Sequence, residues 1–226
     1  MSHMSLGVFA KWPEPGKVKT RLATRLGEEL AARIAEAFLK DTLLRLSEVS
    51  HFDSSYLVYA PSTHESQFAS LDLQDFQLEP QSEGDLGQRL NQFMRRRFDE
   101  GADTVMVLGT DSTTMPIGMS DLALLRLNHS EVVLGPATDG GYYLVCCRNY
   151  SPTLFENIDW STASVLAQTV KRILELNWTL ALLPPWYDVD TPEEWQMLLG
   201  HLEAHDATGQ PLQVPHLQTL IRELNL

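Results

Sequence analysis

The stretch Thr104-Val105-Met106-Val107-Leu108-Gly109-Thr110-Asp111 decides the fold. It begins with an apolar run that does not alternate with polar residues, which is typical of a strand buried on both faces of an α/β sheet. In such sheets ligands bind just beyond the carboxyl ends of the strands, where Thr110, Asp111 and Ser112 follow. Asp111 is therefore a candidate metal ligand or base, although an aspartate at this place can also serve only to form a turn.

The length of 226 residues and the hydrophobic content of 43% suit one globular domain with a sizeable core, which we expect to span residues 5–208. Residues 1–4 (Met-Ser-His-Met) are interpreted as a cloning remnant. Residues 209–226 are expected to form a C-terminal tail with a short helix, which either packs on the domain or forms the contact of a homodimer. No apolar run is long enough to span a membrane and no signal peptide pattern opens the chain, so a cytoplasmic location is expected.

The net charge of −13 disfavours nucleic acid as a partner. One local exception stands out, because residues 11–25 carry five basic side chains and a single acid, Glu14. The five are Lys11, Lys17, Lys19, Arg21 and Arg25. Such a cationic segment on an acidic protein favours a small polyanion as its ligand.

The hydrophobic pattern predicts strands over residues 6–10, 55–59, 76–78, 131–135, 142–147 and 178–183, with 76–78 at an edge of the sheet. It predicts helices over residues 28–49, 63–70, 118–128, 161–176 and 217–224, and one that opens after residue 81 and carries Arg95–Arg97 on a solvated flank. The cysteines, Cys146 and Cys147, are neighbours in a predicted strand. Their side chains therefore point to opposite faces, and a disulfide between them is disfavoured.

The basic segment follows the first predicted strand through the loop Lys11-Trp12-Pro13-Glu14-Pro15-Gly16. A strand, a glycine-bearing loop and a basic cluster in this order are typical of a phosphate cradle, although a solvated charged loop is the alternative. The loop is not a Walker A motif, because Val18 follows Gly16-Lys17 where serine or threonine is needed. A GxGxxG motif is also absent from the sequence, which disfavours a Rossmann oxidoreductase.

Two further segments place acids in loops. Asp139 precedes Gly140 and Gly141, which indicates either a close approach of the backbone to a ligand or a tight hairpin. Asp188 and Asp190 lie two residues apart, so in an extended segment they face the same side. Their mutual repulsion would be relieved by a cation near them or by solvent. Thr191, Pro192 and Glu194 then form a capping box that starts a helix.

Four motifs occur in order along residues 5–200: the segment from Phe9 to Leu22, Leu108-Gly-Thr-Asp111, Gly135-Pro-Ala-x-Asp139-Gly-Gly-Tyr-Tyr-Leu144 and Asp188-x-Asp190-Thr-Pro-Glu193. In this combination the chain resembles the GT-A-type glycosyltransferase-like proteins that are also called radical-SAM/selenodomain-associated transferases. More distantly, two of the segments are similar to parts of 2-phospholactate guanylyltransferase and of molybdenum-cofactor nucleotidyltransferases.

The resemblance implies a nucleotide-diphospho-sugar transferase fold of the GT-A type, with three α/β/α layers around a mixed, mostly parallel sheet. It implies Mg²⁺ or Mn²⁺ held by Asp111 together with Asp188 or Asp190. It also implies that phosphates contact the basic residues of the first loop (Lys11, Lys19 and Arg21, with Lys17 beside them) and that Gly84, Asp85, Leu86 and Gly87 shape a base pocket. Where members of the family have proline two residues after the aspartate, this chain has Thr113, which predicts a more flexible turn.

The sequence therefore predicts a metal-dependent transferase that acts on a nucleotide sugar and an unknown small acceptor. Asp139 is the candidate base, and Lys19 is the candidate catalytic cation on the phosphates. Nucleotidyl transfer from a nucleoside triphosphate, with release of pyrophosphate, is the alternative reaction. A non-catalytic nucleotide-binding protein that has kept the fold is an alternative of another class.

Overall fold

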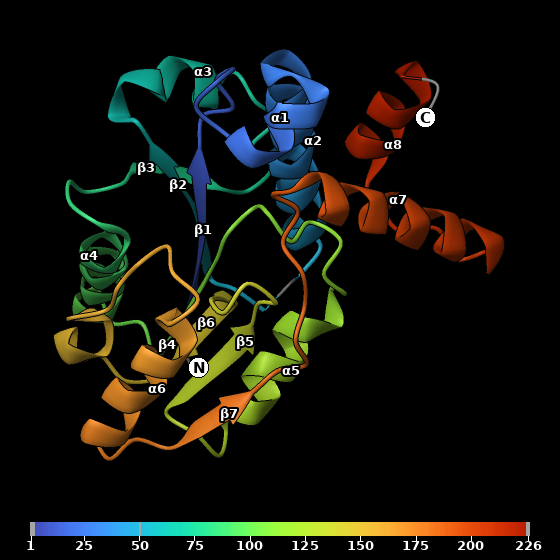
Figure 1. Ribbon diagram of the computed structural model, residues 1–226. Helices are drawn as coiled ribbons and strands as arrows, with labels where there is room; N and C mark the ends of the chain where they lie inside the picture. The colour runs from blue at the N-terminus through green and yellow to red at the C-terminus, as the bar shows by residue number, and fades with distance from the viewer. Residues whose placement is uncertain (1–2, 50, 225–226) are drawn as a thin grey trace.

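The predicted central strand is β4 (Thr104–Leu108), and all five of its residues are buried. The protein is described by a computed structural model that covers residues 3–49 and 51–224. Met1 and Ser2 of the expected cloning remnant and the last two residues of the expected tail lie outside the described residues. Strand β4 lies in a seven-stranded sheet of order β3-β2-β1-β4-β6-β5-β7, which Figure 1 shows in ribbon form.

The sheet is mixed and mostly parallel. Strands β1 (Met4–Lys11), β2 (Ser54–Ala60), β3 (Gln77–Pro80) and β4 pair in parallel. Strand β6 (Tyr142–Cys147) runs antiparallel to both neighbours, β4 and β5 (Val132–Pro136), and β5 pairs in parallel with β7 (Leu180–Leu182). The carboxyl ends of β1, β4 and β5 therefore meet at one end of the sheet, which is where the sequence places its candidate functional loops.

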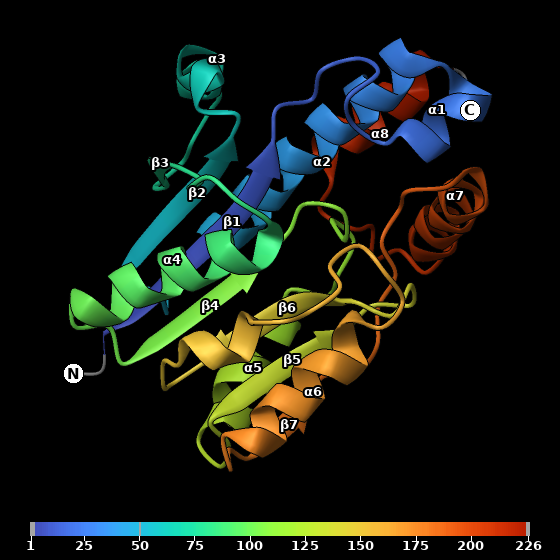
Figure 2. The same ribbon diagram turned by 60° about the vertical axis from the view of Figure 1, so that its left-hand side comes forward.

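Helices cover both faces of the sheet, as Figure 2 shows most clearly. Helices α4 (Leu86–Asp99) and α6 (Val165–Glu175), with the short helix η2 (Pro152–Phe155), cover one face. The other face is covered by α2 (Glu28–Ser47), α5 (Gly118–Leu127) and α3 (Glu65–Ala69), which follows η1 (Ser62–His64). Cys146 and Cys147 are buried in these two opposite cores and are not bonded to each other, which confirms their expected alternation. The predicted three-layer α/β/α fold is confirmed.

A third apolar cluster joins α2 to three further helices, α1 (Thr20–Leu26), α7 (Pro192–Ala207) and α8 (Pro215–Glu223). The predicted capping box of α7 is confirmed, because the Thr191 hydroxyl accepts from the Glu194 N–H while the Glu194 carboxylate accepts from the Thr191 N–H. None of the helices in the described part of the chain combines the length and the apolar character that crossing a bilayer requires.

Several boundaries differ from the sequence-based expectations. Helix α1 was not predicted, because its seven residues are too few for a clear apolar period and Gly27, at φ 83°, separates it from α2. The helix expected from residue 161 begins at Val165 instead, since the Thr162 hydroxyl donates to the Asp159 carbonyl oxygen within a turn. Strand β1 begins at Met4, inside the expected remnant, because its N–H donates to the Asp53 carboxylate.

The expectation of three solvated arginines on α4 is wrong for Arg97. Its side chain is only 3% exposed and forms ion pairs with Glu79 at 3.0 Å and Glu100 at 3.2 Å. Its guanidinium also stacks 3.9 Å from the centre of the Tyr56 ring. Arg97 thus attaches α4 to the β2–β3 edge of the sheet, and two carboxylates compensate its burial.

Helix α8 begins without a capping side chain of its own, and Asp41 of α2 replaces it. The buried Asp41 carboxylate accepts from the backbone N–H groups of His216 and Leu217, both at 2.9 Å, and lies 2.8 Å from the His216 Nδ1. These are two of the N–H groups that a helix start leaves without intrahelical partners. The expected C-terminal helix is therefore held on α2 by a carboxylate from a distant part of the chain.

We expect the pH dependence of stability to change in Asp41→Asn. Burial raises the pKa of Asp41, against the opposing effect of the Leu217 and His216 N–H groups. The folded protein therefore retains this proton to a higher pH than the unfolded chain. The contribution of this carboxyl group to stability is complete below the ordinary aspartate pKa of about 3.9, and it falls as pH rises through the raised pKa of the folded state. In urea unfolding at a series of pH values, the free energy of unfolding of the wild type minus that of the variant should fall as pH rises.

The matched control is Asp121→Asn on α5, where the aspartate side chain is 58% exposed, so that the burial described for Asp41 does not apply. A wild-type advantage that instead grows with pH above the ordinary aspartate value would show that the hydrogen bonds to α8 outweigh the burial of the charge.

Candidate functional site

Three loops meet at the carboxyl ends of the strands. The segment that follows β7 runs beside the ends of β5 and β4, because the Trp186 N–H donates to the Pro136 carbonyl oxygen at 3.0 Å and the Val189 N–H donates to the Asp111 carbonyl oxygen at 3.1 Å. Val189 itself is buried, which fixes the extended segment with Asp188 and Asp190 on either side of it. The structure thus brings these two aspartates to Asp111.

Lys19 joins the three loops. Its Nζ lies 2.6 Å from Asp111 Oδ1, 2.8 Å from the Val189 carbonyl oxygen and 3.5 Å from Asp190 Oδ1, and its side chain is only 3% exposed. Burial by itself lowers the pKa of Lys19, but Asp111 and Asp190 outweigh it, so the pKa is raised above its ordinary value. The ammonium therefore stays charged at neutral pH and carries the positive charge at the centre of the acids.

The local backbone explains how this lysine reaches the acids. Lys19 immediately precedes α1 and adopts the left-handed conformation, with φ 45° and ψ 43°. Residues other than glycine rarely occupy this region, and it recurs at functional sites. The buried Leu22 anchors α1, and the Phe38 ring of α2 lies 4.7 Å from the Lys19 Nζ.

Arg21 adds a second cation at the outer side of the cluster. Its Nη2 lies 3.0 Å from Asp190 Oδ2, and its side chain is 63% exposed. The other basic residues of the predicted cradle lie apart from the acids. Lys17 pairs with Glu14 at 2.9 Å and is 66% exposed, and Lys11 is exposed at the end of β1. The structure therefore brings Lys19 and Arg21 of the basic segment to the aspartates.

Asp188 is the most perturbed acid of the cluster. It accepts a hydrogen bond from the Ser112 hydroxyl. Burial, together with the neighbouring Asp111, Asp139 and Asp190, raises the pKa of Asp188 to about 7, while the bond from Ser112 opposes them. Ser112 was expected to follow the central strand, but no role in the site was predicted for it. The four carboxyl groups are thus close enough to repel, and Lys19 offsets the charge of two of them.

The Asp139 segment is a hairpin that joins β5 to β6, which confirms the hairpin interpretation. Asp139 Oδ1 accepts from the Gly141 N–H at 2.9 Å. Gly140 has a φ of 94°, and a Cβ there would lie 2.4 Å from the Ala163 carbonyl oxygen. The glycines are therefore explained by the turn and its packing, while the Asp139 carboxylate still acts electrostatically on Asp188.

The residues predicted to shape a base pocket form the start of α4. Asp85 accepts from the Gln88 N–H at 2.8 Å, and Gln88 Oε1 accepts from the Asp85 N–H at 2.9 Å, which is a capping box. Gly84 has a φ of 107°, and Gly87 packs so closely that a Cβ would lie 2.4 Å from the Trp160 Nε1. These contacts are structural, and their effect is to present Leu86 toward the aspartates.

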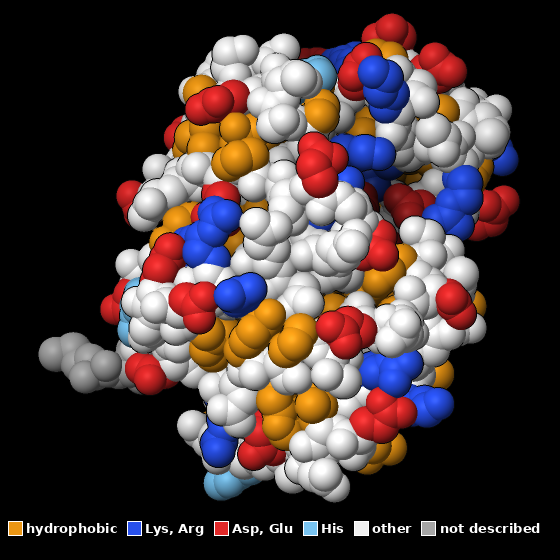
Figure 3. All heavy atoms as spheres, turned by 90° about the vertical axis from the view of Figure 1, so that its left-hand side faces the viewer, with side chains coloured by type: hydrophobic (Ala, Val, Ile, Leu, Met, Phe, Trp, Pro, Cys, Tyr) orange, Lys and Arg blue, Asp and Glu red, His pale blue; other side chains and the backbone are white. Residues whose placement is uncertain are grey.

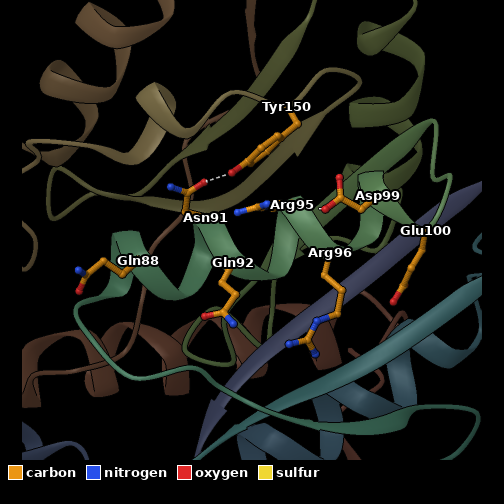
Figure 4. A pocket seen from close by; sticks show the side chains of 8 residues that line it. All are labelled: Gln88, Asn91, Gln92, Arg95, Arg96, Asp99, Glu100 and Tyr150. Carbon is orange, nitrogen blue, oxygen red and sulfur yellow. Dashed lines mark hydrogen bonds and ion pairs between the residues drawn. The ribbon is translucent and has the colours of Figure 1, made fainter.

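A cavity of about 200 Å³ opens beside the cluster. Asp111, Ser112 and Asp188 line one side of it, and apolar side chains from α4, β1, β4 and β6 line the rest; they include Phe9, Leu86, Leu90, Val107, Tyr142 and Val145. A larger hollow of about 640 Å³, shown in Figure 4, lies on the outer face of α4. There Tyr150 donates to Asn91 at 2.7 Å and Arg95 pairs with Asp99 at 3.5 Å. We place the candidate site at the smaller cavity, because it is the one that the clustered acids line.

The donor set suits a divalent cation such as Mg²⁺ or Mn²⁺, which prefers carboxylate and carbonyl oxygens. Asp111, Asp188 and Asp190 supply such oxygens, and the Lys19 ammonium is a cation that already lies between two of them. Within residues 3–49 and 51–224, however, no group of three or more His, Cys, Asp or Glu side chains is arranged to hold a metal ion. The three carboxylates thus have the oxygen atoms that such an ion prefers, and the Lys19 ammonium lies between those of Asp111 and Asp190.

The turn after β4 is held by α2. The buried Arg45 donates to the Thr113 carbonyl oxygen and, at 2.7 Å, to the Met115 carbonyl oxygen. The Thr113 side chain is buried, 3.3 Å from the Thr42 hydroxyl and 3.4 Å from the Phe38 carbonyl oxygen. Hydrogen bonds thus attach the turn to α2, and the expectation that threonine makes it more flexible than proline stays a prediction. Arg45 was not predicted, and the signal that could have identified it is a charged residue on the apolar face of the predicted helix over residues 28–49.

We expect Arg45→Met to destabilise the protein by about 1.5–3 kcal/mol, the usual contribution of hydrogen bonds to a charged group. The variant keeps the length of the side chain but leaves the carbonyl oxygens of Thr113 and Met115 without their donors. Urea unfolding measures the effect, and Arg95→Met on the 69% exposed side chain of α4 is the control. Equal losses in the two variants would mean that Arg45 does not hold the turn.

Comparisons with known proteins identify the family and the fold of the chain. Residues 42–162 match the family described as "Uncharacterized protein conserved in bacteria (DUF2064)". A search of curated proteins found no match. A solved structure from Desulfovibrio desulfuricans G20, provisionally assigned as a nucleotide-diphospho-sugar transferase, is 31% identical over 99% of this chain and 98% of its own, with a TM-score of 0.85.

Two more distant solved structures share the fold. A cytidylyltransferase from Leptospira borgpetersenii serovar Hardjo-bovis is 13% identical over 100% of this chain and 96% of its own, with a TM-score of 0.58. Rv0371c from Mycobacterium tuberculosis H37Rv, in complex with manganese, is 18% identical over 88% of this chain and 98% of its own, with a TM-score of 0.50. By its matching segment and its fold, the chain belongs to the DUF2064 family and has the nucleotide-diphospho-sugar transferase fold.

Proposed function

We propose that this protein is a metal-dependent transferase that takes a nucleotide sugar as its donor. The observation that carries the proposal is the meeting of Lys19 and Arg21 with Asp111, Asp188 and Asp190 at the carboxyl ends of the strands. Cations and acids in one site match a chelated polyphosphate, because the cations bind phosphate oxygens and the acids bind a divalent ion. The relationship to the D. desulfuricans protein supports the same donor class.

Lys19 and Arg21 would bind the phosphates. Lysine acts on phosphate as a compact point charge, whereas the guanidinium of arginine can bind two oxygens at once. Lys11 and Lys17 remain proposed contacts of the outer part of the ligand, since Lys11 ends β1 and Lys17 lies on the loop that leads from it to Lys19. Two cations at the acids suit a diphosphate better than a triphosphate, which favours a nucleotide sugar.

Asp111, Asp188 and Asp190 would hold Mg²⁺ or Mn²⁺, which when bound stabilises negative charge on the departing phosphate. The need for such an ion is supported by the charge of the cluster, where burial and three neighbouring carboxylates raise the pKa of Asp188 to about 7. The manganese complex of the M. tuberculosis protein, which shares the fold, supports the choice of metal.

The remaining residues would bind and orient the organic parts. The cavity beside Asp111 and Asp188 has apolar walls, including Phe9 and Leu86, that suit the flat face of a base or a sugar. Gly84, Asp85 and Gly87 would act here by fixing the start of α4. Asp139 is exposed at the tip of the β5–β6 hairpin, where its carboxylate could deprotonate an acceptor hydroxyl.

Nucleotidyl transfer from a triphosphate is the second candidate, and the observation that favours it is the shared fold with a cytidylyltransferase. The two reactions differ in their products. Incubation with Mn²⁺ and a panel of nucleotide sugars should release a nucleoside diphosphate, as water takes the sugar in place of the unknown acceptor. Release of pyrophosphate from a nucleoside triphosphate, with no reaction of nucleotide sugars, would replace the first proposal by the second. Binding of nucleotides without either product would indicate a non-catalytic protein.

We expect Asp111→Asn to abolish the metal-dependent part of ligand stabilisation. With Mn²⁺ and a bound nucleotide at about 100 times its Kd, the wild type should gain roughly 5–10 °C in thermal unfolding. The variant should retain the smaller gain that the nucleotide produces without metal, because Lys19 and Arg21 remain. Asp121→Asn, at an exposed site on α5, should behave as the wild type. An unchanged metal effect in Asp111→Asn would remove Asp111 from the site.

A further inference from the structure

The Lys19 ammonium lies between two of the carboxylates proposed to hold a metal ion. Its ammonium contacts one oxygen each of Asp111, Asp190 and the Val189 backbone, all of which are hard donors. The side chain is 3% exposed, so solvent does not separate these charges. The described part of the chain has no group of three or more potential metal-ligating side chains arranged for a metal. A divalent ion approaching the free protein would therefore meet carboxylates that already have a cationic partner.

We propose that Lys19 makes metal binding dependent on a polyphosphate, because its ammonium must move from the carboxylates to the phosphates before the ion can bind. This inference rests on the proposed function, since it concerns the same site. A lysine is suited to such a transfer, because its charge lies at the end of a flexible four-carbon stem. Lys19 is the residue that would restrict the site to the chelated ligand and exclude the free ion.

The surroundings of Lys19 favour its movement. Its backbone adopts the sparsely populated left-handed conformation, so its position depends on the contacts of the side chain and not on an intrinsic preference. The loop before it contains the exposed residues 15–17. Arg21, which holds the second oxygen of Asp190, is 63% exposed and can turn to the same ligand. Once both cations bind phosphate, Asp111 and Asp190 are free for the ion beside Asp188.

The direct test is the affinity of the full chain for Mn²⁺ alone, followed by the electron paramagnetic resonance signal of the free ion. We expect the wild type to bind Mn²⁺ weakly and Lys19→Met to bind it about tenfold more tightly, within the usual range of coupling between sites. Adding Asp111→Asn to Lys19→Met should abolish the gain, which places the ion at this cluster. Lys40→Met is the matched control, because Lys40 pairs with a carboxylate, Glu36 at 2.6 Å, on α2.

A Mn²⁺ affinity of Lys19→Met equal to or below that of the wild type would overturn the inference. Where Lys19→Met does not fold, Arg21→Met decides the question, since it frees one oxygen of Asp190 and should increase Mn²⁺ affinity by a few-fold; no increase would count against the inference.

A second measurement separates this inference from the proposed function. Equilibrium dialysis of pyrophosphate should show about tenfold tighter binding to the wild type with Mn²⁺ than without it, because coupling between two ligands is reciprocal. The coupling should be smaller in Lys19→Met. If neither protein binds pyrophosphate or nucleotides under any condition, the transferase proposal fails, while the Mn²⁺ titration still decides whether Lys19 blocks the carboxylates.

Discussion

The candidate site depends on one buried ammonium. Lys19 contacts the loop after β4 through Asp111 and the loop after β7 through Val189 and Asp190. Without a cation at this place, the aspartates on these loops would repel one another in partly buried surroundings, where charges interact more strongly than in water. The net charge of the chain is −13, so a cation here is not supplied by a general excess of basic residues. Figure 3 agrees, because the face it shows mixes acidic and basic side chains without a broad basic surface.

Helix α2 is the element that positions the parts of this site. Its Phe38 lies against the Lys19 ammonium, its Arg45 holds the turn that follows Asp111, and its Asp41 caps α8. One long helix thus packs on the sheet and also fixes the basic loop and the acidic turn. This arrangement attaches the turn after Asp111 to α2, while Lys19 lies between an exposed loop and the short helix α1.

Much of the fold could be predicted from the sequence, because the apolar composition of runs such as Thr104–Leu108 is enough to predict that they are buried strands. The capping box at Thr191 and the opposite faces of Cys146 and Cys147 follow from local rules for the same reason. Contacts between distant segments could not be predicted in this way. The burial of Arg97 depends on its ion pair with Glu79 of strand β3. The capping of α8 depends on Asp41, which is 175 residues away from His216. For the site, the resemblance to GT-A-type proteins implied that Asp111 lies near Asp188 or Asp190. The separation of Lys19 and Arg21 from Lys11 and Lys17 could not be predicted, and Lys19 reaches the aspartates from a left-handed backbone conformation.

The central claim is that Lys19 and the aspartates form one site for a metal ion and its polyphosphate. The most direct measurement is a crystal structure of the protein with Mn²⁺ and a nucleoside diphosphate, in which the anomalous signal locates the ion. Our account predicts an anomalous peak bound by Asp111 together with Asp188 or Asp190, with the Lys19 ammonium moved onto a phosphate oxygen. A peak elsewhere on the molecule, or a bound nucleotide with Lys19 still paired to Asp111 and no ion beside it, would contradict the account.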